Sequence, residues 1–157
     1  MGDGPVTPNL VLGLGTDRIA NNEPVTPGAA VLHKGIGDPK IGLVRLEGAW
    51  IHGDGYIESA AAEGSSCTIT NTAARVDVTF STADGASARV GVNEDGPPLD
   101  REWCGNDCIE DGALGAAVTV DDKRDYWVTK RSEPEMHELT FVATSKGLRI
   151  HAMRFSE

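Results

Sequence analysis

Between Ala88 and Phe155 the sequence consists of short runs in which apolar and polar residues alternate, separated at close intervals by turn residues. Turn chemistry occurs at Glu94-Asp95-Gly96, at 121–124 and at Ser145-Lys146-Gly147. Each run has the length and the period-2 pattern of a half-buried β-strand. This strand series most strongly constrains the fold, because such a series is typical of two packed antiparallel sheets.

Similar runs precede Ala88, and no segment of useful length has the 3.6-residue period of an amphipathic helix. The sequence therefore predicts an all-β protein, an antiparallel β-sandwich of the jelly-roll or galactose-binding-like kind, with a closed barrel as the alternative. A change of phase between Ile150 and Met153 predicts a β-bulge near Ala152. The expected strands are 10–14, 29–32, 41–47, 56–60, 67–71, 75–80, 88–93, 116–120, 126–130, 137–143 and 148–155, with turns at 35–39, 53–55, 83–85 and 132–135 and a loop over 99–113.

The chain of 157 residues is long enough for one domain with its own core. Pro5 and Pro8 make the first nine residues unsuitable for a helix. We expect residues 1–9 to be a linker remnant and residues 10–157 to form a single β-sandwich domain. The N-terminus has no basic segment followed by an apolar one, so no signal peptide is predicted.

The formal net charge of −10 comes from 24 acidic and 14 basic residues, without a dense basic cluster. Binding to phosphate groups depends on an excess of Lys and Arg. Nucleic acid and anionic membranes are therefore poor candidate partners. No apolar run of about 18 residues occurs, so membrane insertion is not expected.

The three cysteines are Cys67, Cys104 and Cys108. Cys67 lies in a strand-like run, which indicates a buried structural thiol. Cys104 and Cys108 can close a small disulfide loop if their side chains converge, and such a bond would indicate an oxidising compartment. The alternative is thiol–disulfide redox chemistry, but nearby acidic residues raise thiol pKa values and disfavour the thiolate.

Oxygen donors gather in the same loop, at Asp107, Glu110 and Asp111. Carboxylates of this kind hold Ca²⁺, although the spacing differs from that of an EF-hand loop. A solvated acidic loop is the alternative. The sequence predicts no other cofactor, and it contains no recognisable hydrolase motif.

Sugars bind by stacking on exposed aromatic rings, with carboxylates, amides and guanidinium groups taking the hydroxyls. Trp103 is the best candidate ring, because Arg101, Asn106 and Asp107 lie in the same loop. Trp127 is a second candidate ring. Trp50 follows a glycine in a strand-like run and is expected in the core.

Several short motifs, in order, resemble those of the C-terminal domain of DipZ-type thioredoxin-like proteins. They are TPNLVLG at 7–13 (family T-P-E-x-Y-L-G), LEGAW at 46–50 (L-x-G-x-W), VNEDG at 92–96 (V-x-L-D-G), GND at 105–107 with EDG at 110–112 (G-x-D-V-x-x-D-G), RDY at 124–126, HELTF at 137–141 and AMRF at 152–155.

The resemblance implies a jelly-roll module similar to carbohydrate-binding modules, placed outside the cytoplasm in the periplasm or cell envelope. Its ligand would be a carbohydrate or a protein, including a thioredoxin-fold domain. The chain lacks the C-x-x-C of that domain, and Trp103, Cys104 and Cys108 lie outside the family pattern. We therefore expect a non-catalytic binding or docking module. The alternatives are a redox protein using Cys104 and Cys108, and a purely structural domain.

Overall fold

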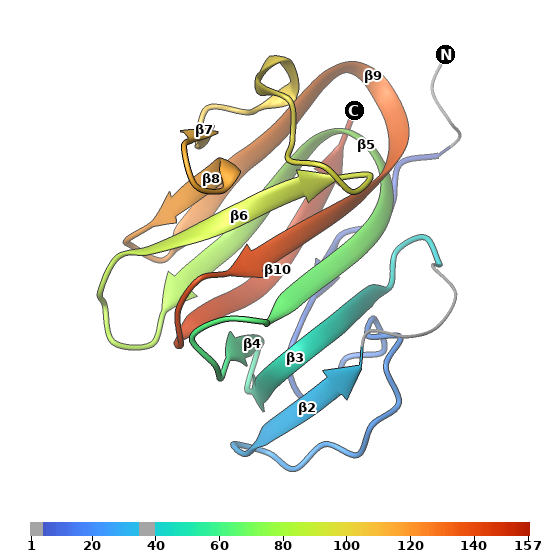
Figure 1. Ribbon diagram of the computed structural model, residues 1–157. Helices are drawn as coiled ribbons and strands as arrows, with labels where there is room; N and C mark the ends of the chain where they lie inside the picture. The colour runs from blue at the N-terminus through green and yellow to red at the C-terminus, as the bar shows by residue number, and fades with distance from the viewer. Residues whose placement is uncertain (1–4, 35–39) are drawn as a thin grey trace.

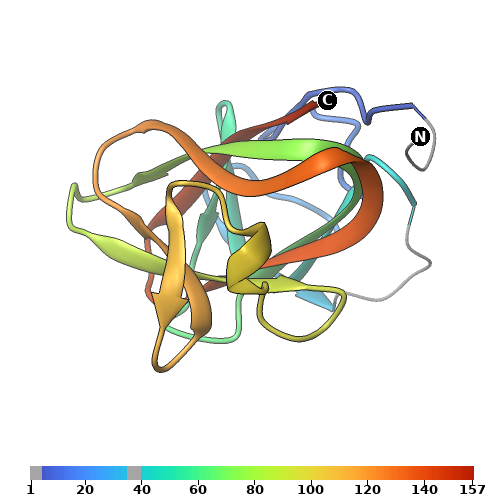
Figure 2. The same ribbon diagram turned by 90° about the horizontal axis from the view of Figure 1, so that it is seen from above.

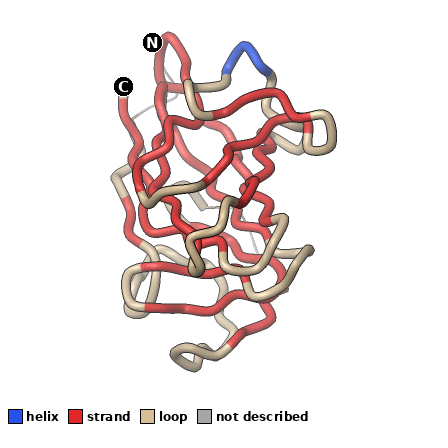
Figure 3. Tube along the Cα trace, turned by 90° about the vertical axis from the view of Figure 1, so that its left-hand side faces the viewer, coloured by secondary structure: helices blue, strands red, loops and turns tan. Residues whose placement is uncertain are grey.

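The computed structural model describes residues 5–34 and 40–157 (Figure 1). The described part is built almost wholly of β-strands, and its one helical element is the 3₁₀ turn η1 (Figure 3). The elements are β1 (Leu10–Val11), β2 (Ala30–Lys34), β3 (Val44–Gly53), β4 (Tyr56–Ser59), β5 (Ser66–Thr82), β6 (Ala88–Glu94), η1 (Arg101–Trp103), β7 (Cys108–Asp111), β8 (Gly115–Val120), β9 (Arg124–Ala143) and β10 (Leu148–Ser156).

The two longest strands, β5 and β9, pair with each other along nearly their whole lengths. Figures 1 and 2 show them bending together from one layer of the molecule into the other. The first half of β5 pairs with the second half of β9, from Ser66–Val142 to Ala73–Glu135. After the bend, Arg75 pairs with Lys130 and the ladder continues to Phe80–Arg124. The two layers are therefore joined by continuous strands.

The remaining strands extend both layers, and every pair of neighbouring strands is antiparallel. On one layer β3 pairs with the first half of β5, β2 lies beyond β3, and β6, β8 and β7 follow β9. On the other layer β10 pairs with the second half of β5, and β4 and β1 pair with β10. The predicted antiparallel β-sandwich of the jelly-roll, galactose-binding-like kind is confirmed.

The core lies between the layers and follows the alternation of the strands. Val76, Val78 and Phe80 are buried, as their shared face predicts. The Phe80 ring lies 5.9 Å from the Tyr126 ring and 5.6 Å from the Phe141 ring, measured between centroids. Such tilted pairs add to the burial of apolar area that stabilises the domain.

Two sequence predictions about single core residues are confirmed. Trp50 is fully buried, and its indole N–H donates a hydrogen bond to the Glu47 carbonyl oxygen at 3.0 Å. Cys67 is also fully buried, and burial raises the pKa of its thiol to about 12. A thiol with this pKa stays protonated and unreactive at neutral pH.

The bulge predicted near Ala152 is confirmed by a shift of register between Ile150 and Ala152 in the pairing of β10 with β5. The shift lets Met153 and Phe155 face the core together with Leu148 and Ile150.

The turn predicted at 132–135 is wrong, because β9 continues through it. Residues 131–134 lie between the pairs Arg75–Lys130 and Ala73–Glu135, with only Ala74 opposite them. Pro134 cannot donate to a regular ladder, and the shift of register accommodates it. The separate strands predicted at 67–71 and 75–80 are one bent strand, β5.

The loop predicted over 99–113 contains η1 and the short strand β7, which pairs with β8. The sequence did not predict β7, because its acidic residues, Glu110 and Asp111, indicated a loop. The turn predicted at 35–39 lies outside the described residues.

The segment before β1 is held against the sandwich. Thr7 is buried, its amide donates to the Thr72 carbonyl oxygen, and its hydroxyl accepts from the Thr72 amide. The Asn9 side-chain oxygen accepts from the Phe155 amide. The division into a linker at 1–9 and a domain at 10–157 stays a prediction. Within the described ranges, no helix has the length and apolar character needed to cross a bilayer.

The passage of β3 from its pairing with β5 to its pairing with β4 depends on Gly48. This residue has φ +85°, and a Cβ there would lie 2.2 Å from the Gly64 carbonyl oxygen. Gly85 has a similar φ of +76° but open space around it. We predict that Gly85→Ala lowers the free energy of unfolding by about 1–2 kcal/mol and that Gly48→Ala lowers it by clearly more. Urea denaturation measures both values, and equal losses would contradict this account of β3.

Candidate ligand-binding site

The loop from Asp100 to Gly112, where the sequence placed the ligand site, docks on the first half of β9. Asp100 caps η1 by accepting from the Glu102 amide at 2.9 Å. The Gly105 amide donates to the Val128 carbonyl oxygen at 2.8 Å, and the Asp107 amide donates to that of Trp127 at 3.0 Å. The loop is thus fixed by backbone hydrogen bonds.

Asp107 and Trp127 take part in this docking. The Asp107 carboxylate accepts from the Trp127 amide at 2.8 Å and from the Arg124 guanidinium at 3.0 Å. Partial burial acts to raise the pKa of Asp107, but these hydrogen bonds outweigh it and lower the pKa. The Trp127 indole N–H donates to the Thr129 carbonyl oxygen, and the Arg75 guanidinium lies 4.1 Å from its ring centroid. Both side chains therefore already contact other residues of the protein.

The residues predicted as Ca²⁺ ligands each have their own arginine partner. Asp107 bonds to Arg124, as described, and exposed Glu110 lies 3.5 Å from exposed Arg101. Asp111 bonds to Arg89 at 2.6 Å and accepts from the amides of 113 and 114, which lower its pKa. Among the described residues, the three side chains do not form a group of converging donors. The Ca²⁺ site stays a prediction, and Asn106 is exposed.

Cys104 and Cys108 are brought together, as their spacing predicts. Both thiols are buried, and their Sγ atoms lie 3.3 Å apart. Burial raises the pKa of both, and the neighbouring Cys104 raises that of Cys108 further. A high thiol pKa opposes nucleophilic attack, so this geometry does not favour the redox alternative.

Sequence reasoning missed a polar group at the bend of β9, which we call the Arg131 cluster: Glu94, Asp95, Trp103, Arg131 and His137. Arg131 and His137 lie on β9, Glu94 ends β6, Asp95 begins the next turn, and Trp103 ends η1. Pairing of β6 with β9 brings these segments together. Only the V-x-x-D-G turn and the His137 strand were visible in the sequence, and their proximity depends on the strand order.

Arg131 is the centre of the cluster, and only 5% of its side chain is exposed. It forms a bidentate pair with Glu94, using Nη1 at 3.0 Å from Oε2 and Nη2 against Oε1. Its Cζ atom lies 4.7 Å from the centroid of the Trp103 ring. A buried bidentate pair stacked on an aromatic ring holds a rigid arrangement of donors and acceptors.

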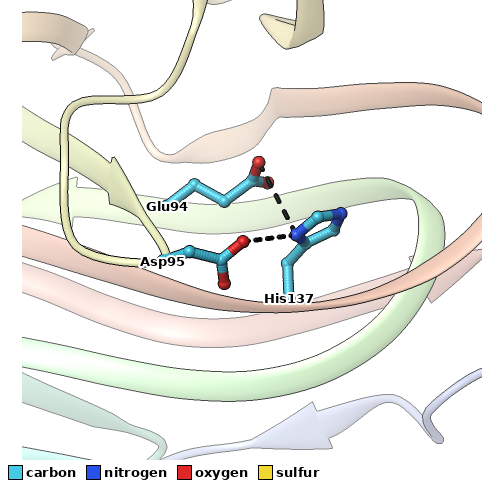
Figure 4. Close-up of side chains that lie close together, drawn as sticks. All are labelled: Glu94, Asp95 and His137. Atoms are coloured by element: carbon cyan, nitrogen blue, oxygen red, sulfur yellow. Dashed lines mark hydrogen bonds and ion pairs between the residues drawn. The ribbon is translucent and has the colours of Figure 1, made fainter.

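The His137 side chain is 21% exposed and lies beside Glu94 and Asp95 (Figure 4). Its Nδ1 atom lies 2.7 Å from Asp95 Oδ2 and 3.8 Å from Glu94 Oε1, and its Nε2 atom lies 3.2 Å from Glu135 Oε1. Burial acts to lower the pKa of His137, but the hydrogen bonds to Asp95 and Glu135 and the charge of Glu94 outweigh it and raise the pKa.

The backbone conformation of Asp95 and its hydrogen bonds to Glu138 fix the position of its carboxylate. Asp95 is the one described non-glycine residue with positive φ, at +55°, a conformation that Asp adopts more readily than most residues. Its amide donates to the Glu138 carbonyl oxygen at 2.8 Å, and its Oδ1 accepts from the Glu138 amide at 2.9 Å. These two bonds fix the carboxylate beside His137.

Two depressions border the Arg131 cluster along β9, one at Trp103 and Arg131 and the other at Asp95 and His137. One has a volume of about 210 Å³ and is lined by Glu102, Trp103, Lys130, Arg131 and Ser132. The other has a volume of about 400 Å³ and is lined by Ile41, Thr70, Asp95, Met136, His137 and Glu138. Partly buried Trp103 therefore borders a hollow that also presents cationic side chains.

The donors of Glu94, Asp95 and His137 lie close enough together to surround a cation. However, the Arg131 guanidinium already neutralises Glu94, so an added cation would meet positive charge at short range. The arrangement is better suited to hydroxyl groups, which donate to the carboxylates and accept from the guanidinium group.

A family model described as a thioredoxin-like C-terminal domain matches residues 7–156. The chain belongs to this family. A solved structure, that of a family two carbohydrate esterase from Cellvibrio japonicus, superposes with a TM-score of 0.53 at 11% sequence identity. The match covers 80% of this chain and 32% of the esterase chain, and it shows a shared β-sandwich fold. A comparison with curated proteins finds no match.

We predict that Asp95→Asn lowers the pKa of His137, as measured by NMR titration of the imidazole signals. Because folding raises this pKa, His137 adds stability that is present below its unfolded pKa of about 6.5 and lost as the pH rises through the folded pKa. His151 is the control, because burial lowers its pKa and its Nε2 bonds to Ser81 instead. An unchanged His137 pKa in the variant would contradict the role of Asp95.

We also predict that Cys104 and Cys108 form a disulfide under oxidising conditions, because their sulfur atoms are already adjacent. Protein that is oxidised and then denatured without reductant should titrate with one free thiol, that of Cys67. After reduction it should titrate with three. Three free thiols in both samples would show that the pair does not close.

Proposed function

We propose that this chain is a non-catalytic binding module whose ligand is a carbohydrate held at the Arg131 cluster. The observation that carries the proposal is a half-buried tryptophan stacked on a buried Arg–Glu pair, at the edge of a hollow. Sugars are bound by such combinations of an aromatic face with fixed carboxylate and guanidinium groups. The β-sandwich fold and the membership of the thioredoxin-like C-terminal family agree with a module of this kind.

The module would be the C-terminal part of a DipZ-type thioredoxin-like protein and would act outside the cytoplasm. The ordered motifs from 7–13 to 152–155 support the DipZ-type assignment. An oxidising compartment would also allow Cys104 and Cys108 to form a structural disulfide bond.

A glycan array of neutral and acidic oligosaccharides, followed by calorimetry with the best binder, tests the carbohydrate proposal. Trp103→Ala should weaken binding about tenfold, since stacking contacts contribute about 0.5–1.5 kcal/mol and Arg131 loses its support. Ile109→Ala is the control, because Ile109 is exposed on β7 at 59%. Unchanged affinity in Trp103→Ala, or an array without any binder, would contradict the proposal.

A second candidate ligand is a protein, namely a thioredoxin-fold domain. It is favoured by exposed apolar side chains within residues 11–32: Val11, Leu14, Val25 and Leu32. Leu32 is 70% exposed on β2, which in the described sheet pairs only with β3. In a binding assay with such a domain added separately, Leu32→Glu should abolish the interaction and Trp103→Ala should leave it unchanged.

A further inference from the structure

A second group of functional side chains lies away from the Arg131 cluster, between β2, β3 and the segment before β2. His33 and His52 face each other with their Nε2 atoms 2.9 Å apart, and both residues are buried, with exposures of 2% and 3%. Their rings meet at 66° with centroids 5.1 Å apart. Two buried imidazoles with facing Nε2 atoms need an explanation, because two lone pairs at this distance repel each other.

A proton between the two rings resolves the repulsion, and Glu23 decides which ring carries it. The Glu23 Oε1 atom lies 2.7 Å from His33 Nδ1, so His33 carries its proton on Nδ1 and donates it to the carboxylate. His33 Nε2 is then an acceptor, and His52 donates from its Nε2–H.

A carboxylate that accepts a hydrogen bond from Nδ1–H of a histidine orients the ring and makes the lone pair on Nε2 a better metal ligand, and this is the usual arrangement behind a metal-bound histidine. From this geometry we propose that His33 and His52 form a binding site for a divalent transition-metal ion, with Nε2 of each ring as ligand and Glu23 as the outer support. On binding, the proton of His52 moves from Nε2 to Nδ1 of the same ring, and both rings turn so that their Nε2 lone pairs point at the ion, which lies beside the line joining the two nitrogen atoms.

The separation of the nitrogen atoms narrows the choice of metal. With metal–nitrogen distances of about 2.0–2.1 Å, a separation of 2.9 Å corresponds to an angle of about 90° at the metal. This angle suits neighbouring positions in a tetragonal or octahedral site, as preferred by Ni²⁺ and Cu²⁺. A tetrahedral Zn²⁺ would require the rings to move apart to about 3.3 Å. Ca²⁺ and Mg²⁺ prefer oxygen ligands and are not expected to bind.

The surroundings leave room for the other ligands of the ion. His33 and His52 line a cavity of about 220 Å³ whose wall also includes Thr16, Ile19, Asn21 and Val25. One water molecule occupies about 30 Å³ of liquid volume. The cavity can therefore hold the ion with water molecules in the positions that the two imidazoles leave open.

Titration of the wild-type protein with Ni²⁺ tests the site, using calorimetry for stoichiometry and NMR for location. We expect one ion per chain and paramagnetic broadening centred on His33 and His52. Broadening centred on His137 or on Cys104 and Cys108, or the absence of saturable binding at millimolar Ni²⁺, would overturn the proposal. These readouts need no variant, so they stand even if a substitution impairs folding.

Variants then assign the ligands. His52→Asn should abolish binding, and Glu23→Gln should weaken it about 10–100-fold, as expected for the loss of an outer carboxylate. His137→Asn is the matched control, since it removes the histidine of the Arg131 cluster. The Ni²⁺ affinity of this variant should equal that of the wild type. Equal affinity in folded His52→Asn would also overturn the proposal.

Discussion

The antiparallel pairing of β5 with β9 is the interaction on which the rest of the structure depends. Each strand crosses from one layer of the sandwich to the other, so every other strand is attached, directly or through one or two neighbours, to this pair. A bend in two paired strands requires a local break of register, and it occurs between Ala73 and Arg75. The break releases residues 131–134 from regular pairing and turns Arg131 toward Glu94 and Trp103. The same constraint that folds the sheet over therefore creates the candidate binding site.

Charge in this acidic protein is arranged locally. Most of its described arginines lie against a particular carboxylate, an aromatic ring or both: Arg75 with Asp77 and Trp127, Arg124 with Asp107 and Tyr126, Arg131 with Glu94 and Trp103, and Arg149 with Glu58 and Tyr56. The exposed pairs contribute little stability. The Arg131–Glu94 pair differs because both side chains are nearly buried, so its charges act at short range and with little screening by water.

The sequence predicted what depends on local alternation. The inward faces of β5, β6, β9 and β10, the buried positions of Trp50 and Cys67, and the bulge beside His151 all follow from the period-2 pattern. The bend was not predictable. Pro134 indicates a turn in the sequence, and only the shift of register in the paired strand β5 shows that β9 continues through it. The Arg131 cluster and the His33–His52 pair were not predicted from the sequence for a related reason. Their members are separated along the chain, and only strand order and side-chain packing bring them together. Trp103 is partly exposed at the end of η1, and its role as a ligand-binding ring stays a prediction. Its neighbours in sequence, Asn106 and Asp107, are not its partners in space.

The central claim is that the bend of β9 holds the ligand. It is tested most directly by following the Trp103 indole N–H and the Arg131 Nε–H signals by NMR while a binding oligosaccharide from the array is added. We predict that these two signals shift first and most strongly, together with that of the His137 ring. Shifts confined to β2 and the segment before it, with Trp103 and Arg131 unchanged, would contradict it.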